Sequence, residues 1–196
     1  MSFITRGFSG RSRDRDPRLP PGQTLVEDWP VLSAGPTPRI GADEWEFVVT
    51  TEHGHHRWGW DDFRALGIED VTVDIHCVTH WSKLEMPWRG VPLDAVLAEV
   101  ETGHDYAMVH SYGGYTTNVP LEDLRDGKAW VAFEADGEDL SPEHGGPARL
   151  LVPHLYFWKS AKWVRGLVTM PTDDPGFWEQ NGYHLRGDPW REERYW

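Results

Sequence analysis

Short segments in which apolar and polar residues alternate recur along most of this chain, and they constrain its fold more than any other feature. Alternation with a period of two is typical of strands with one buried face, because successive side chains of a strand point to opposite sides. We predict strands at residues 45–49, 71–75, 106–110, 115–119, 130–135, 149–152 and 164–170. The fold class expected from this pattern is α+β, dominated by strands.

Helical signals are fewer and shorter. Asp61 can cap a short helix that Gly67 ends, and a second helix is predicted to begin after Pro92. Residues 120–124 favour a single helical turn, and the histidine-rich residues 53–56 favour a turn.

Composition changes along the chain divide it into three parts. Residues 1–39 are rich in proline, glycine and arginine and are predicted to form an extended N-terminal arm. Residues 40–175 hold the predicted strands and form the domain. Residues 176–196 are aromatic and charged, so we expect this C-terminal tail to pack on the domain. The length of 196 residues fits a single domain.

Cysteine content and charge restrict the function. Cys77 is the only cysteine, so an intramolecular disulfide is impossible, and a reducing cytoplasm fits best. The net charge of −13 makes nucleic acid an unlikely partner, because it repels phosphate backbones. No apolar run approaches the roughly 20 residues of a membrane span, and residues 1–10 lack the apolar core of a secretion signal.

Cys77 follows the predicted strand 71–75, at a position where a loop begins and chemistry is often found. Three interpretations remain open from the residues alone. The thiol is buried and structural, or it binds zinc together with His76 and His80, or it acts as a nucleophile with a histidine base. No second cysteine supports the zinc site, and no hydrolase signature supports the nucleophile.

A second group of residues indicates an anion site. Four cations occur close together in a chain that is otherwise acidic: Arg149, Lys159, Lys162 and Arg165. Gly145 and Gly146 permit close approach of main-chain amides, and Ser160 adds a hydroxyl donor. The alternative is a solvated basic strand and loop.

Together, these segments resemble the oxidoreductase molybdopterin-binding domain that sulfite oxidase, assimilatory nitrate reductase and the catalytic subunit of methionine-sulfoxide reductase share. The resemblance runs from about residue 31 to residue 170. It depends on the strand that ends in Cys77 and on four further motifs in order: Trp-Arg-Gly-Val-Pro-Leu at 88–93, Ser-Tyr-Gly-Gly-Tyr-Thr-Thr-Asn-Val-Pro at 111–120, His-Gly-Gly-Pro-Ala-Arg-Leu at 144–150 and Lys-Ser-Ala-Lys-Trp at 159–163. The fold that it implies is the strand-dominated, mixed-sheet fold of the sulfite-oxidase molybdopterin-binding domain.

The resemblance also implies a cofactor and a set of site residues. The cofactor is molybdenum-molybdopterin, with the Cys77 thiolate as the protein ligand of the metal. The implied cofactor-binding residues are Ser111, His144, Arg149, Lys159, Ser160, Ala161 and Lys162. His80 and His110 are expected to orient substrate or move protons, and Arg11 or Arg13 to supply a further pterin contact.

The implied activity is two-electron oxygen-atom transfer on a small sulfur- or nitrogen-oxide substrate. The sequence lacks the arginines that hold sulfite near the metal cysteine of sulfite oxidases, since Val78, Thr79 and His80 follow Cys77. We find no haem-binding or immunoglobulin-like segment, so a separate electron-transfer protein is expected as partner. Two alternatives remain: a non-catalytic protein that binds pterin or another anion, and a zinc-binding structural module.

Overall fold

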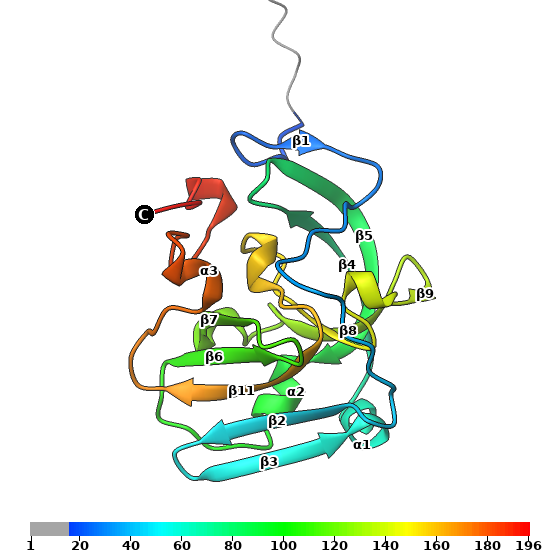
Figure 1. Cartoon of the computed structure of the whole chain (residues 1–196), viewed down its shortest axis with the longest axis vertical. Helices are drawn as coiled ribbons and strands as arrows, with labels where there is room; N and C mark the ends of the chain where they lie inside the picture. Colours follow the sequence, from blue (N-terminus) through cyan, green and yellow to red (C-terminus); the bar gives the residue numbers. More distant parts are fainter. Residues whose placement is uncertain (1–15) are drawn as a thin grey trace, which may run out of the picture.

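Two β-sheets form the body of the computed structural model, which describes residues 16–196 (Figure 1). The six-stranded sheet contains β1 (Thr24–Leu25), β4 (Glu69–His76), β5 (Trp81–Pro92), β8 (Trp130–Ala135), β9 (Glu138–Asp139) and β10 (Arg149–Leu151). The five-stranded sheet contains β2 (Glu46–Thr51), β3 (Gly54–Gly59), β6 (Tyr106–Ser111), β7 (Thr116–Pro120) and β11 (Val164–Met170).

Both sheets mix parallel and antiparallel pairs. In the larger sheet, β5 pairs with β1 in parallel and with β4 and β8 in antiparallel fashion. The smaller sheet has the order β3-β2-β11-β6-β7, and its one parallel pair is β2 with β11. The predicted class, α+β with strand-dominated mixed sheets, is confirmed.

The helices are short and connect the strands. They are α1 (Trp60–Ala65), α2 (Leu93–Leu97) and α3 (Phe177–Gln180), with the 3-10 helices η1 (Leu121–Asp123), η2 (Pro142–His144), η3 (Phe157–Lys159) and η4 (Pro189–Arg191). Among residues 16–196 no helix is both long and apolar enough to cross a membrane.

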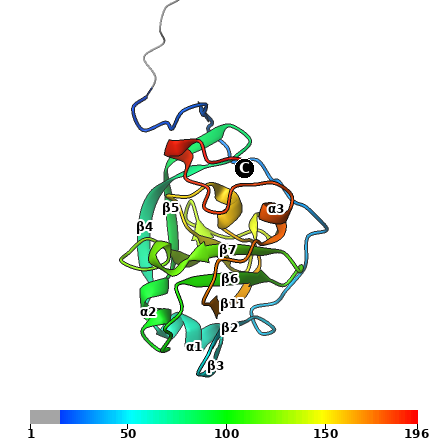
Figure 2. The same cartoon turned by 90° about the vertical axis from the view of Figure 1, so that its left-hand side faces the viewer.

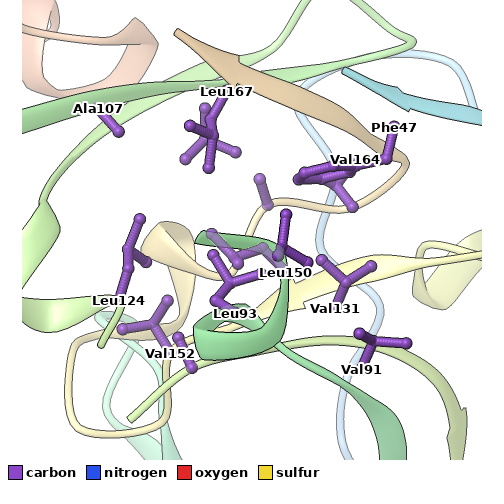
Figure 3. Close-up of a cluster of buried hydrophobic side chains, with 14 of the residues drawn as sticks. Phe47, Val91, Leu93, Ala107, Leu124, Val131, Leu150, Val152, Val164 and Leu167 are labelled. Carbon is purple, nitrogen blue, oxygen red and sulfur yellow. The ribbon is translucent and has the colours of Figure 1, made fainter. Parts of the chain in front are cut away.

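The main core lies where the two sheets meet. Figure 3 shows Phe47 and Leu167 of the five-stranded sheet together with Val131 and Leu150 of the six-stranded sheet. All four side chains are almost completely buried. Burial of apolar surface between two sheets is the principal stabilising contribution in such a fold, and it holds the strand ends that carry the site in fixed positions.

Two local predictions were wrong. Residues 53–56 were expected to form a turn, but His55 and His56 belong to strand β3. This strand lies at the edge of its sheet with mostly exposed side chains, so its sequence lacks the alternation that reveals a strand. Helix α1 is preceded by Gly59 as its N-cap, and Asp61 lies inside the first turn instead of capping it.

The C-terminal segment lies across one end of the molecule. Figures 1 and 2 show it, in orange to red, running from α3 past η4 toward the loop that joins β4 to β5. A hydrogen bond from Arg194 to the main-chain carbonyl of Val78 connects the two segments. Arg194 also donates to the Pro21 carbonyl, so residues from both ends of the described chain meet beside the end of β4.

Candidate active site

A cavity of about 440 Å³ opens between the sheets and the two terminal segments. Its walls come from residues 29–30 and 32–36, the loop after β4, the turn between β6 and β7, the beginning of β10, and residues 157–158 and 160–163. Aromatic side chains of the C-terminal segment complete it: Phe177, Trp178 and Tyr183. The volume is in the range of pockets that hold small ligands and cofactors.

Cys77 follows the last residue of β4 and lines this cavity. The loop that it begins is closed by two hydrogen bonds, from the Cys77 amide to the Trp81 carbonyl (2.8 Å) and from the His80 amide to the Cys77 carbonyl (3.1 Å). The sulfur lies 3.1 Å from Thr79 Oγ1. Burial raises the pKa of the Cys77 thiol, so a cation or a metal is needed to hold it as a thiolate.

Arg149 is the first residue of β10, and its guanidinium is buried in the cavity wall. It donates hydrogen bonds to the carbonyls of His144 (2.8 Å) and Ser160 (2.7 Å), and its Cζ lies 4.1 Å from the Phe157 ring centre. Its Nε has no hydrogen-bond partner within the described residues. Burial lowers the pKa of Arg149 to about 9, which reflects the cost of this charge without a counter-ion.

Lys162 lines the same cavity. Its ammonium group donates to the main-chain carbonyls of Leu32 (2.7 Å) and Glu143 (2.6 Å). Burial, followed by the nearby charge of Arg149, lowers the pKa of Lys162 to about 8. No carboxylate of residues 16–196 lies within 4.0 Å of either cation. Two cations that share a cavity without an acidic partner favour an anionic ligand between them.

His144 and the N-terminal arm form the adjacent wall. The imidazole stacks on the Trp29 indole with ring centres 3.9 Å apart, and Nε2 lies 3.3 Å from the Trp29 carbonyl. Burial lowers the pKa of His144. Gly145 follows with a φ of 108°, and a Cβ there would lie 3.0 Å from Lys162 Cα. Glycine is therefore required for this close approach.

The structure brings six of the predicted site residues together on the cavity wall: Cys77, His144, Arg149, Ser160, Ala161 and Lys162. The Ser160 hydroxyl accepts a hydrogen bond from the Val152 amide (2.9 Å), so it also holds β10 in place.

Lys159 and Arg165 do not belong to the expected cation cluster. The Lys159 ammonium is completely buried and forms an ion pair with Glu179 (2.7 Å). It also donates to the carbonyls of Asn118 and Leu185. Arg165 is half-exposed and lies 3.9 Å from Glu46. Lys159 ends η3 and Arg165 lies on β11, and of the four cations only Arg149 and Lys162 line the cavity.

Three further predicted residues lie outside the cavity lining. His80 is exposed, with Nδ1 2.9 Å from the Gly22 carbonyl. His110 lies on β6, where burial and then the charge of Arg165 lower its pKa. Ser111 has a buried hydroxyl without a partner among the described residues. Arg11 and Arg13 lie outside the described residues.

Sequence reasoning missed most of the aromatic wall. The residues concerned are Trp29, Tyr115, Phe157, Trp158, Phe177, Trp178 and Tyr183. The signal available was the high tryptophan content, twelve in all, which does not say which side chains meet. Among residues 16–196 no three His, Cys, Asp or Glu side chains are grouped to hold a metal ion, so the zinc module has no ligand set in this part of the chain.

Comparisons with known proteins identify the family of the chain. The family "Oxidoreductase molybdopterin binding domain" matches residues 34–178. The chain is 41% identical to "Uncharacterized oxidoreductase YuiH" of Bacillus subtilis, over 94% of this chain and 96% of that protein. It is 33% identical to "Sulfite oxidase, mitochondrial" of Drosophila melanogaster, over 76% of this chain and 31% of the relative.

More distant similarities extend the comparison. "Protein-methionine-sulfoxide reductase catalytic subunit MsrP" of Pseudomonas syringae pv. tomato is 23% identical, over 85% of this chain and 56% of the relative. The chain thus spans about half or less of these longer relatives. The crystal structure of the sulfane dehydrogenase SoxCD from Paracoccus pantotrophus shares the fold, with a TM-score of 0.64 and 20% identity over 74% of this chain and 42% of that chain.

The residues present fit the cofactor that this family binds. Molybdopterin carries a phosphate, and the cavity presents the buried Arg149, with its unpartnered Nε, and the half-buried Lys162. A soft thiolate suits molybdenum, and the sole cysteine of the chain lines the same cavity. The chain therefore belongs to the oxidoreductase molybdopterin-binding domain family, and it is a sulfite-oxidase-like oxidoreductase whose cofactor is molybdenum-molybdopterin.

Proposed function

We propose that this chain carries out two-electron oxygen-atom transfer on a small sulfur- or nitrogen-oxide substrate, with Cys77 as the protein ligand of molybdenum. The observation that carries the proposal is the position of Cys77, which shares one cavity with Arg149 and Lys162. When bound, the cofactor supplies the oxygen-atom transfer and the two-electron redox chemistry. The residues of the chain bind and orient it.

Arg149 and Lys162 neutralise the pterin phosphate in this proposal. Arg149 is buried and Lys162 is half-buried, and neither has an acidic partner among residues 16–196, so the phosphate completes their charge balance. His144 lies on the cavity wall, and burial lowers its pKa, which favours the neutral imidazole. The positions of His80 and His110, outside the cavity lining, do not support a direct role for either in proton transfer.

The wall near Cys77 supports a neutral substrate over an oxyanion. Aromatic rings form much of it: Trp81, Phe157, Trp158 and Tyr183. The two cationic side chains that line the cavity, Arg149 and Lys162, are those assigned to the phosphate. A sulfoxide or N-oxide needs no counter-ion, whereas sulfite does. The relative named protein-methionine-sulfoxide reductase also points to a sulfoxide.

A separate electron-transfer protein is the proposed redox partner, and the cytoplasm is the proposed location. The net charge of −13 favours a partner with a basic surface. The single buried thiol fits a reducing compartment.

The first experiment is metal and pterin analysis of the protein purified from a host that makes molybdopterin. We expect about one molybdenum and one pterin per chain, and reduction of a dialkyl sulfoxide or an N-oxide by a chemical electron donor. Cys77→Ala should abolish turnover and lose molybdenum but retain the pterin, because Arg149 and Lys162 remain. Thr79→Val, which changes the nearest hydroxyl to the sulfur, is the matched control and should retain the metal.

Several outcomes would contradict the proposal. Turnover retained by Cys77→Ala removes the cysteine from the reaction. Pterin without molybdenum in the unmodified protein supports the non-catalytic binding alternative, and zinc without pterin supports the structural one. Oxidation of sulfite with no activity on neutral oxides would overturn the assignment of a neutral substrate.

A further inference from the structure

A buried arginine near the C-terminal end of the described chain contacts the loop that begins with Cys77. Arg194 is 7% exposed, and its Nη1 donates a hydrogen bond of 2.7 Å to the carbonyl of Val78, the residue after Cys77. Its Nη2 donates to the carbonyl of Pro21 at 3.3 Å. No carboxylate of residues 16–196 lies within 4.0 Å of the guanidinium. Burying a guanidinium without a carboxylate partner costs folding free energy, so the contacts that it makes require an explanation.

Arg194 is one of two side chains of residues 16–196 that hydrogen-bond to main-chain carbonyls of the loop after β4. The preceding carbonyl, that of Cys77, accepts a hydrogen bond from Gln23 Nε2 at 3.0 Å. Two successive carbonyls of the loop are thus held by side chains from opposite ends of the described chain. The Arg194 Cζ also lies 4.8 Å from the ring centre of Tyr156, which packs in the same apolar cluster as Cys77. The guanidinium is therefore fixed by its stacking and by two acceptors.

We propose that Arg194 is a positioning residue for Cys77: it holds the Val78 carbonyl, keeps the sulfur at the cavity wall and places a positive charge beside the thiolate. This inference deepens the proposed function and rests on it, because Cys77 is there the metal ligand. A fixed cation near the thiolate stabilises the more negative, reduced form of the centre. It therefore raises the reduction potential of the bound metal.

Three variants test the proposal in the full-length protein, purified with its cofactor. Arg194→Met removes the charge and both hydrogen bonds. Arg194→Lys keeps the charge but cannot bridge the two carbonyls as a planar fork does. Arg191→Met is the matched control, because Arg191 lies on the same segment with a side chain that is 67% exposed.

We expect Arg194→Met to retain pterin and to lower the potential of the metal, with a shifted thiolate-to-molybdenum absorption band. The kcat should fall about tenfold while KM stays within about twofold, since substrate contacts are unchanged. Amide hydrogen exchange of residues 77–81 should become about tenfold faster or more. Arg194→Lys should restore the potential but only part of the exchange protection, and Arg191→Met should match the unmodified protein.

Hydrogen exchange distinguishes the failure of this inference from that of the proposed function, because it needs no metal. If the unmodified protein holds no molybdenum, the proposed function fails, and faster exchange of residues 77–81 in Arg194→Met still shows that Arg194 orders the loop. Unchanged exchange, or an unchanged band and potential, overturns the inference. If Arg194→Met does not fold, Arg194→Lys decides by the same readouts. Unfolding of both variants also overturns it, since Arg194 would then maintain the fold instead of the thiolate.

Discussion

At the scale of single residues, the two cations of the cavity differ from Lys159 in having no acidic partner among residues 16–196. Lys162 and Arg149 line the cavity and donate only to main-chain carbonyls. Lys159, only three residues before Lys162, is neutralised by Glu179. The difference between an anion site and an internal ion pair is therefore a difference in where the nearest carboxylate lies.

The charge of Lys162 makes anion binding depend on pH. Its pKa is lowered from the ordinary value of 10.5 to about 8, so the ammonium loses its proton in a range where an exposed lysine keeps it. The affinity of the cofactor-free chain for pyrophosphate should therefore fall as the pH rises from 7 to 9, by up to about tenfold. Titration followed by tryptophan fluorescence measures this.

Lys162→Met provides the comparison for this prediction. Its affinity should be lower at pH 7 and should fall much less between pH 7 and 8, because the charge that titrates in this range is gone. Any loss that remains toward pH 9 belongs to Arg149, whose pKa is about 9. An equally steep loss of affinity in this variant would assign the pH dependence to another group.

At the scale of elements, a buried ion pair joins η3 to α3. Glu179 Oε1 accepts hydrogen bonds from Trp158 Nε1 (2.8 Å) and Thr117 Oγ1 (2.9 Å) and lies 2.7 Å from Lys159 Nζ. The network connects a cavity-lining tryptophan to the C-terminal segment, which also lines the cavity. The shape of the cavity therefore depends on contacts behind its surface.

Replacing Lys159 by Met should destabilise the protein strongly. The change leaves Glu179 as an uncompensated buried charge, which costs about 3–5 kcal/mol. Urea unfolding followed by tryptophan fluorescence measures this cost. Lys128→Met, which removes a lysine bonded to the Glu122 carbonyl, should cost less than about 1 kcal/mol. The double change Lys159→Met with Glu179→Leu should recover part of the loss, and no recovery would show that the pair is not the cause.

The elements also show how far sequence reasoning reaches. Strands β8 and β11 have the predicted bounds, since their apolar residues form clear runs. Strand β5, which pairs with three neighbours, was missed because Pro87 and Gly90 interrupt its pattern. The ion pair of Lys159 could not be predicted either, because its partner lies twenty residues away and only folding brings them together. Local pattern reveals strands, while the surroundings of a charge depend on tertiary contacts.

At the scale of the whole molecule, the net charge of −13 should govern encounters with an electron carrier. Opposite charges accelerate association, and salt screens this effect over a Debye length of about 10 Å at 0.1 M. Turnover with a basic redox protein as electron source should fall by about tenfold or more between low and high ionic strength. Steady-state rates measured over a salt series test this.

An acidic carrier of similar potential serves as the control. Its rate should rise or stay level with salt, because screening then relieves repulsion. A fall of equal size with both carriers would point to an effect of salt on the enzyme itself.

The bond between Arg194 and the Pro21 carbonyl joins residues that are 173 positions apart in the chain. During synthesis, the loop after Cys77 therefore lacks one of its supports until residue 194 has been added. Strand β1 and Gln23 are synthesised early, and their contacts, with β5 and with the Cys77 carbonyl, do not involve the later segment. The cavity wall formed by residues 177–183 is made equally late. We therefore expect insertion of the cofactor to follow the synthesis of these residues, and a nascent chain that ends before residue 177 should not retain it.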